Sequence, residues 1–282
     1  MADQRVVAVL GRGVVPADVP ILRADDLGVL RGDGIFETMH VRGGQPWLLD
    51  EHLARMARSA ARLDLALPPA AELAELAGQA CGAWPAGAEG ALRLVCTRGA
   101  EEGGETTVFA TVAAVGEPAR RARRNGIAIA TATLGFAAAA RTAAPWLLGG
   151  VKSLSYAVNM ASQRWALAQG VDDVLWVSVD GYALEAPTST LVWLEEDVLY
   201  TVPAGTTGIL PGTTARWLLD NSGKLGFAAE ERMVTPAELV GSNGVWLTSS
   251  VRGLAEIHAI DGVLREPARH TDAIRDLLGF PT

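Results

Sequence analysis

Lysine is nearly absent from this chain of 282 residues. Of its 24 lysines and arginines, only Lys152 and Lys224 are lysine, so a cation that serves solubility or pairing is almost always an arginine. A lysine retained against this bias suggests chemistry that a guanidinium cannot perform, such as forming a Schiff base with a carbonyl. Lys224 follows Asn221-Ser222-Gly223, which predicts a helix end, and an exposed lysine explains it. A solvated surface lysine is the simplest interpretation of Lys152 taken alone, and the remaining motifs decide between the two readings.

Cysteine and histidine are also scarce. Cys81 and Cys96 are too few for a disulfide scaffold and do not have metal-ligand spacing, so the sequence predicts a reducing, cytoplasmic setting. The histidines are scattered singly along the chain, at positions 40, 52, 258 and 270. This pattern predicts no metal site.

Long apolar runs and a basic balance are missing too. No stretch approaches the roughly 18 uncharged apolar residues of a membrane span, and residues 1–5 lack the layout of a signal peptide. We therefore expect no membrane association. The formal charge of −8 argues against general nucleic-acid binding, and the basic run Arg120–Arg124 is more typical of a solvated linker. An apolar fraction of 49% is ample for a buried core.

The periodicity predicts an α+β fold in two domains, of which the smaller occupies residues 1–118. Asp50 is expected to cap a helix on which an apolar stripe recurs at helical spacing, with Arg55 on another face. Strands are expected at 6–10, 31–41 after a glycine turn, 45–49, 90–97 and 106–115, and helices at 51–65 and 70–83.

Residues 119–126 are predicted to be an interdomain linker, because the surrounding run combines Pro, Arg and an Asn-Gly pair. A larger, β-rich domain with helices is expected over 127–282. Thr235, followed by Pro236 and by Glu238, predicts a helix start. Strands are expected at 127–131, 173–179, 182–185, 190–194, 198–202 and 245–248, an Asp261-Gly262 turn within 255–264, and helices at 156–169 and from about 215.

Three polar motifs of the second domain bear on chemistry. The Gly/Thr-rich loop Gly205–Thr214 runs into a helix and offers N–H groups, hydroxyls and a positive helix end to a phosphate. Thr248-Ser249-Ser250 follows a strand and offers further hydroxyls, and Glu185 ends a hairpin strand. Each has an ordinary explanation as a turn or a surface acid. Together with Lys152 they match the requirements of pyridoxal phosphate, whose aldehyde needs an amine, whose pyridine nitrogen needs a carboxylate and whose phosphate needs donors.

With these motifs in place, the chain resembles the class IV, fold-type IV pyridoxal-phosphate enzymes, which include branched-chain aminotransferases, D-amino-acid aminotransferases and aminodeoxychorismate lyases. The resemblance extends from about Asp26 to Gly262. Its matching stretches are RGDGIFETMHVRGGQPWLLDEHLARM, LVCTRG, KSLSYAVNM, DGYALEAPTSTLVW and GILPGTTAR.

The resemblance implies roles for individual residues. Lys152 matches the catalytic Schiff-base lysine, and Glu185 matches the glutamate that pairs with the pyridinium nitrogen. Residues that match the phosphate and cofactor ligands are Arg55, Thr213, Thr214, Ser249 and Ser250. The sequence departs from the family pattern at Thr190, where Asn is usual, and at Ala215, where Arg is usual. The first departure puts in doubt the local surroundings of the cofactor.

Three further positions bear on the reaction. Thr97-Arg98-Gly99 matches a motif of the D-amino-acid aminotransferases and the lyases, whose arginine can meet a substrate carboxylate. The D-amino-acid aminotransferases have tyrosine where this chain has Phe36, and histidine where it has Ala100. KSLSYAVNM, in contrast, resembles the D-amino-acid aminotransferases more than the lyases. Phe36 and Arg98 are thus the candidate substrate-binding residues.

From this resemblance we expect an aminodeoxychorismate lyase, which gives 4-aminobenzoate and pyruvate for folate synthesis. The alternative is an aminotransferase that acts on D- or branched-chain amino acids with 2-oxoglutarate, and dual activity is compatible with both. A binding or regulatory protein without catalysis is a third reading, against which the intact Lys152 and Glu185 argue. The resemblance also implies a homodimer and a small, amino-acid-like substrate.

Overall fold

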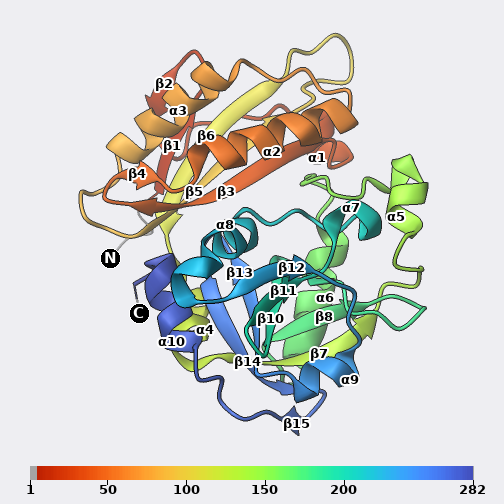
Figure 1. Cartoon of the computed structure of the whole chain (residues 1–282). Helices are drawn as coiled ribbons and strands as arrows, with labels where there is room; N and C mark the ends of the chain where they lie inside the picture. Colours follow the sequence, from red (N-terminus) through yellow and green to blue (C-terminus); the bar gives the residue numbers. More distant parts are fainter. Residues whose placement is uncertain (1–4, 282) are drawn as a thin grey trace. The chain divides into compact units, whose positions relative to one another are not determined.

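The computed structural model describes residues 5–281, which form two compact units (Figure 1). The first unit extends to Gly116 and also contains Val151–Tyr156; the second comprises Glu117–Gly150 and the chain from Ala157 onward. The chain is 32% helical and 30% strand, so the predicted α+β class is confirmed. Lys152 belongs to the first unit, whereas the predicted boundary grouped it with residues 127–282. The domain limits themselves stay a prediction.

The first unit is built on an antiparallel sheet in the order β2-β1-β6-β5-β3-β4. The longest pairing joins β3 to β5, from Gly34 opposite Thr97 to Val41 opposite Gly90. The strands are β1 (Arg5–Val9), β2 (Gly13–Val15), β3 (Gly34–Arg42), β4 (Gln45–Pro46), β5 (Gly90–Thr97) and β6 (Thr107–Ala114), and a short helix, α1 (Leu27–Leu30), precedes β3. Each strand expected in this part of the sequence is present, the returning strand after β3 being shorter than predicted.

Two helices, α2 (Leu49–Arg62) and α3 (Ala70–Gly82), cover one face of this sheet (Figure 1). The predicted apolar stripe is confirmed, since Leu53, Met56 and Ala60 are buried against the sheet. The predicted cap is wrong: α2 begins one residue before Asp50, and Leu48 is its N-cap in a left-handed conformation with φ of 58°. Asp50 lies in the first turn, where its carboxylate still complements the helix dipole.

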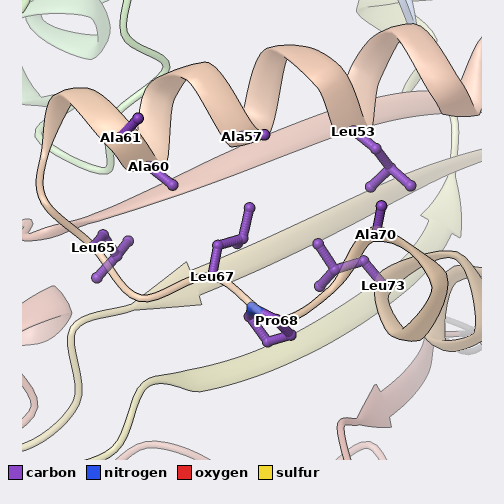
Figure 2. A pocket seen from close by; sticks show the side chains of 9 residues that line it. All are labelled: Leu53, Ala57, Ala60, Ala61, Leu65, Leu67, Pro68, Ala70 and Leu73. Atoms are coloured by element: carbon purple, nitrogen blue, oxygen red, sulfur yellow. The ribbon is translucent and has the colours of Figure 1, made fainter.

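A cavity of about 310 Å³ lies where α2, α3 and their connecting loop meet (Figure 2). The side chains that line it are all apolar and belong to leucine, alanine and one proline, Leu53, Leu65 and Leu73 among them. No polar side chain lines it. The cavity is therefore a feature of the packing of the first unit.

The second unit is built on a sheet in the order β12-β11-β10-β13-β14-β7-β8, with β9 paired to β10 and β15 to β14. Trp193 and Leu247 are fully buried in its core. The strands are β7 (Ile127–Thr133), β8 (Asp173–Val177), β9 (Glu185–Ala186), β10 (Ser189–Glu195), β11 (Val198–Thr201), β12 (Ala228–Glu231), β13 (Gly244–Ser249), β14 (Gly253–Ile260) and β15 (Val263–Leu264).

The helices of the second unit include the one predicted at Thr235. The Thr235 hydroxyl accepts a bond from the backbone N–H of Glu238, and the Glu238 carboxylate accepts one from the backbone N–H of Thr235, so the predicted helix start is confirmed as a capping box. The helices are α4 (Glu117–Asn125), α5 (Ala140–Ala143), η1 (Pro145–Leu147), α6 (Ala157–Ala168), α7 (Ala204–Thr207), α8 (Thr213–Asn221), η2 (Ser222–Leu225), α9 (Pro236–Gly241) and α10 (Thr271–Leu278).

The segment predicted as a linker is helical instead, because residues 119–126 lie almost wholly within α4. Arginine and alanine favour helix, and Glu117 pairs with Arg120 and Arg124 along the helix surface. Arg123 is fully buried and donates to the carbonyls of Arg252, Val251 and Pro281. The basic run is thus only partly solvated.

Candidate active site

Lys152 is placed in the first unit by backbone pairing with β3. The N–H of Phe36 donates to the carbonyl of Lys152 at 3.1 Å, and Ser153 forms a bridge with Ile35. The N–H of Lys152 donates to the hydroxyl of Ser59 on α2 at 3.2 Å. Gly34 permits this close approach, because a Cβ at that position would lie 2.7 Å from the side chain of Leu154. The lysine therefore sits on an ordered segment, anchored on both its N–H and its carbonyl.

Two aromatic rings flank the amine of Lys152. Its Nζ lies 4.5 Å from the centroid of the Phe36 ring and 5.7 Å from that of Tyr156. The two rings meet edge to face with their centroids 5.2 Å apart. The structure thus brings Phe36, a predicted substrate residue, to the predicted catalytic lysine.

Arg55 lies on another face of α2 than the apolar stripe, as the helical pattern predicted, and it too is buried. Its Nε and Nη2 donate to the two carboxylate oxygens of Glu37 at 2.8 and 2.6 Å, and Nδ1 of His52 lies 2.7 Å from Oε2 of the same carboxylate. Burial opposes the ionisation of Glu37, but the charge of Arg55 and the hydrogen bonds from Arg55 and His52 outweigh it and hold the pKa of Glu37 at about 2. Burial lowers the pKa of His52, so this histidine is neutral at pH 7.

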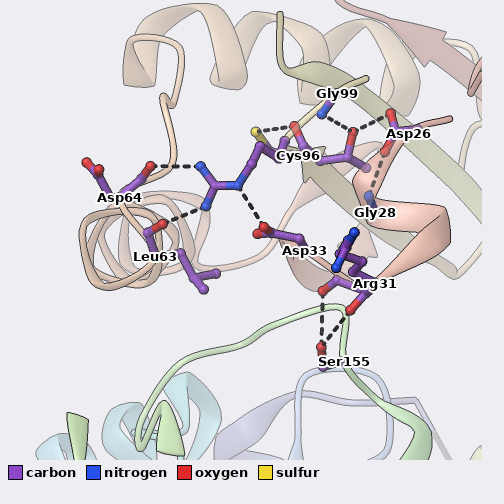
Figure 3. Close-up of polar contacts among 12 residues, drawn as sticks. Asp26, Gly28, Arg31, Asp33, Leu63, Asp64, Cys96, Gly99 and Ser155 are labelled. Carbon is purple, nitrogen blue, oxygen red and sulfur yellow. Dashed lines mark hydrogen bonds and ion pairs between the residues drawn. The ribbon is translucent and has the colours of Figure 1, made fainter. Parts of the chain in front are cut away.

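Arg98 is held by three groups of the first unit, which belong to Asp33, Leu63 and Asp64, the residues labelled in Figure 3. Its Nε donates to Asp33 at 2.7 Å, and its Nη atoms donate to the carbonyls of Leu63 and Asp64 at 2.7 and 3.0 Å. The guanidinium therefore braces the end of α2 against the loop before β3. Whether it also meets a substrate carboxylate stays a prediction.

Glu185 belongs to the second unit, where it is the first residue of β9 and is buried. One carboxylate oxygen accepts from Nη1 of Arg141 at 3.0 Å, and the other accepts from the backbone N–H of Leu210 at 3.1 Å. Arg141 approaches closely because Gly149 and Gly208 pack against it, and a Cβ on either would lie 2.8 Å from its atoms. The carboxylate is thus fixed on both oxygens.

The predicted phosphate loop leads into the N-terminus of α8. Thr213 and Thr214 are the first residues of this helix, and its N-cap, Gly212, supplies no side-chain cap. The unpaired N–H groups of a helix start favour an anion. Gly212 is required at this point because any side chain there would collide with the hydroxyl of Thr190. Thr190, which stands where the family usually has Asn, therefore contacts the predicted phosphate loop.

The later hydroxyls gather at the same helix end. Oγ1 of Thr213 lies 3.4 Å from Oγ of Ser250. Ser249, at the end of β13, instead accepts from the N–H of Arg252 at 3.3 Å and so shapes the turn. The structure thus brings together Thr213, Thr214 and Ser250, with Ser249 one residue away.

An orphaned hydroxyl tests whether these residues fit pyridoxal phosphate. Within residues 5–281, Oγ1 of Thr214 is buried and has no hydrogen-bond partner. Buried polar atoms are normally satisfied, so this hydroxyl at a helix N-terminus fits the role of a donor to a phosphate oxygen. Each unit thus carries groups of the kind that the cofactor needs, an ordered amine at Lys152 in the first and a fixed carboxylate at Glu185 in the second.

Sequence reasoning missed three residues next to the predicted ones. Glu37 and His52 enclose Arg55, and Arg141 binds Glu185. His52 and Arg55 are three residues apart on a helix and so share a face, which is a signal that they interact. Nothing in the sequence connects Arg141 with Glu185, because their contact depends on the fold.

In the part of the chain that the structure describes, no three His, Cys, Asp or Glu side chains gather in a way that could hold a metal ion. None of the helices described is long and apolar enough to cross a membrane.

Comparisons with known proteins identify the family of this chain. The profile of the family described as amino-transferase class IV matches residues 34–260. A protein of Mycobacterium tuberculosis named bifunctional aminodeoxychorismate lyase / D-amino acid transaminase is 38% identical over 265 residues, which cover 91% of this chain and 92% of that protein. The D-alanine aminotransferase of Bacillus licheniformis is 29% identical over 84% of this chain and 82% of its own.

A solved structure is equally similar. It is described as a hypothetical aminotransferase from Mycobacterium tuberculosis in its PLP-bound form, is 38% identical and superposes with a TM-score of 0.92 over 97% of each chain. The family profile covers most of the chain, and the M. tuberculosis relative matches nearly its whole length. The chain therefore belongs to the class IV aminotransferases of fold type IV and is a pyridoxal-phosphate-dependent enzyme.

Proposed function

We propose that this enzyme is an aminodeoxychorismate lyase, which converts 4-amino-4-deoxychorismate to 4-aminobenzoate and pyruvate and so serves folate synthesis. The observation that carries the proposal is the aromatic surface at Lys152, whose Nζ lies 4.5 Å from the Phe36 ring. A ring without a hydroxyl suits a cyclic substrate that becomes aromatic as it reacts. The bifunctional relative from M. tuberculosis, whose name includes this activity, supports the same choice.

The proposed roles follow the chemistry that each residue can supply. Pyridoxal phosphate, when bound, withdraws electrons from the carbon that carries the substrate's amino group. Nζ of Lys152 holds the cofactor aldehyde at rest and removes the proton from that carbon once substrate has displaced it. The C–O bond to the enolpyruvyl group then breaks, the ring becomes aromatic, and the departing group takes up a proton to become pyruvate.

The remaining proposed ligands hold the cofactor. Glu185 is assigned to the pyridine nitrogen, because a fixed carboxylate favours its protonated form. The N-terminus of α8, with Thr213 and Thr214, is assigned to the phosphate together with Ser250 and Arg55. Ser249 supports the turn that carries Ser250.

A second candidate function is D-amino-acid transamination with 2-oxoglutarate. The names of two relatives support it, one being bifunctional and the other a D-alanine aminotransferase. In that reaction Nζ of Lys152 would move the substrate's proton from one carbon to another, and no C–O bond would break. Branched-chain substrates are a weaker alternative, because the Thr97-Arg98-Gly99 motif is not expected in those enzymes.

Product analysis tests the proposal. Purified enzyme is incubated with 4-amino-4-deoxychorismate, and 4-aminobenzoate is quantified by chromatography; parallel reactions contain D-alanine or L-leucine with 2-oxoglutarate. We expect 4-aminobenzoate from the first reaction. Keto acid from D-alanine without any 4-aminobenzoate would establish the second candidate instead, and Lys152→Ala serves as the inactive control for every reaction.

A homodimer in a reducing cytoplasm is also proposed. Helix α6 exposes Val158 and Trp165, which are seven residues apart and so lie on one helix face. Large apolar side chains that share an exposed face are typical of an interface, and a second copy of the chain is the proposed occupant. Cys81 and Cys96 are both free and buried, which suits a compartment without disulfide formation.

A further inference from the structure

A buried polar cluster connects α2 to β3 in the first unit. Glu37 and His52 are fully buried, and Arg55 is 3% exposed. His52, Arg55 and Ser59 recur at helical spacing on α2, and all three are buried. This face of the helix therefore carries a polar stripe next to its apolar one.

Stability alone is a poor reason for such a cluster. Removing two charges from water costs several kcal/mol per ion, and apolar side chains of the same volume are often as stable or more so. A buried ion pair is better explained where the direction of a charged group matters. The geometry around Arg55 has that character.

Glu37 fixes the direction of the Arg55 guanidinium. The two bonds of 2.8 and 2.6 Å use Nε and Nη2, so the carboxylate binds one edge of the planar group, and the orientation of the edge that carries Nη1 is set. Such a two-point contact is more directional than a single charge contact. Lysine at position 55 could not reproduce it.

His52 in turn fixes Glu37. An ionised carboxylate only accepts hydrogen bonds, so the 2.7 Å contact with Oε2 requires that Nδ1 of His52 carries the proton. Because His52 is neutral at pH 7, it holds the carboxylate without adding a second positive charge beside Arg55. The order of support therefore runs from His52 to Glu37 to Arg55.

We propose that Glu37 and His52 are positioning residues for the cofactor phosphate, which they serve by holding Arg55 in a single orientation. The inference rests on the proposed role of Arg55 as a phosphate ligand. It adds to that role two residues that touch neither the cofactor nor the substrate and act only through the guanidinium.

The test compares two aldehydes that differ only in the phosphate. The full chain, freed of cofactor, is titrated with pyridoxal phosphate and with pyridoxal, and the dissociation constants are read from the visible absorbance. Glu37→Gln and His52→Phe should weaken the binding of pyridoxal phosphate by roughly 10- to 100-fold. The binding of pyridoxal, which lacks the phosphate, should change by less than about threefold.

A conservative variant and a matched control distinguish positioning from folding. The side-chain amide of His52→Asn can replace the Nδ1 donor, so it should recover most of the affinity that His52→Phe loses. Glu89→Gln is the matched control. It changes the carboxylate that contacts Nε2 of His40 at the far end of β3, and it should leave both dissociation constants unchanged. Circular dichroism and the melting temperature of each variant verify that it is folded.

The results distinguish a positioning role of Glu37 and His52 from a purely structural one. Equal losses for both aldehydes, or no difference between His52→Asn and His52→Phe, would overturn the proposal in favour of a structural role. If Arg55→Ala weakens pyridoxal phosphate selectively while Glu37→Gln does not, the positioning role is likewise overturned and the role of Arg55 stands. None of these outcomes depends on which reaction the enzyme catalyses.

Discussion

The amine of Lys152 lies 4.5 Å from the centroid of the Phe36 ring. Lys152 is the residue proposed to move the substrate proton. Phe36 is one of the positions at which this chain differs from the pattern of D-amino-acid aminotransferases. A cation near an aromatic face gains about 0.5–2 kcal/mol, depending on its exposure to water. Position 36 is therefore suited to influence both the amine and the substrate that approaches it.

Phe36→Tyr should shift the enzyme towards transamination. The added hydroxyl supplies a hydrogen-bond donor for a carboxylate beside Lys152, and we expect the ratio of D-alanine transamination to 4-aminobenzoate formation to rise about threefold to tenfold. Steady-state rates with both substrates measure this ratio. Phe36→Leu, which removes the ring without adding a hydroxyl, should lower lyase activity and leave transamination unraised. An unchanged ratio in Phe36→Tyr would show that position 36 does not select the reaction.

Lys152→Ala should abolish the covalent attachment of the cofactor, so that borohydride reduction no longer fixes pyridoxal phosphate to the protein. The only other lysine, Lys224, is exposed at the end of a helix, in η2. Lys152→Arg is the matched variant, since it keeps a cation near Phe36 but cannot form the covalent bond. Both variants should lose activity by several orders of magnitude. Cofactor that borohydride still fixes to Lys152→Ala would assign the covalent bond to Lys224.

Much of this architecture follows from local sequence patterns. The glycine turn and alternation before Val41 predicted β3, and Thr235-Pro236 with Glu238 predicted the start of α9, because turn and cap chemistry act over a few residues. The helical conformation of 119–126 was not predicted. Pro and an Asn-Gly pair normally indicate a loop, but neighbouring residues that favour helix can outweigh this tendency. In α4 the proline falls in the first turn and the glycine lies just beyond the end.

Long-range contacts explain the rest. The bonds of Arg98 to Asp33 and of Arg141 to Glu185 join residues that are 65 and 44 positions apart. The periodicity of apolar residues in the sequence carries no information about such long-range pairs. The burial of Arg55 was missed for the same reason, because its acceptor lies on a strand and only the folded sheet brings Glu37 under the helix.

Acid should destabilise the first unit in two stages. The pKa of His52 is lowered by burial from its ordinary value of 6.5, so its stabilising contribution is complete above pH 6.5 and declines as pH falls. The pKa of Glu37 is about 2 against an ordinary 4.5, so its contribution is complete above pH 4.5 and is lost towards pH 2. The second stage amounts to about 3 kcal/mol at most.

Urea unfolding at pH 7, 6, 5 and 4 measures the first stage. His52→Asn has no titrating group at this position, so its stability should fall less between pH 7 and 5 than that of the wild type. His258→Asn, which changes an exposed histidine, is the control and should follow the wild-type curve. Parallel curves for His52→Asn and wild type would contradict the first stage.

Arg98→Leu should destabilise the first unit by about 1–3 kcal/mol, because the partly buried Asp33 and the carbonyls of Leu63 and Asp64 would lose their donor. Arg98→Lys keeps the charge but cannot reach three acceptors at once, so we expect an intermediate loss. Urea unfolding measures both. A substrate role for Arg98 predicts in addition a raised KM for Arg98→Lys at temperatures where the variant is fully folded; an unchanged KM would restrict Arg98 to bracing.

Charge on the exposed face of α6 should separate the proposed dimer. Val158 is 63% and Trp165 is 44% exposed, and burying the two side chains against a second copy would contribute about 1.5–3 kcal/mol each. We therefore expect Val158→Glu/Trp165→Glu to elute as a monomer in size-exclusion chromatography with light scattering, where the wild type elutes as a dimer. Leu264→Glu is the matched control, because Leu264 is 79% exposed on β15 and lies on a different element of the same unit. A dimeric mass for the double variant would place the interface elsewhere on the chain, and a monomeric wild type would exclude the dimer itself.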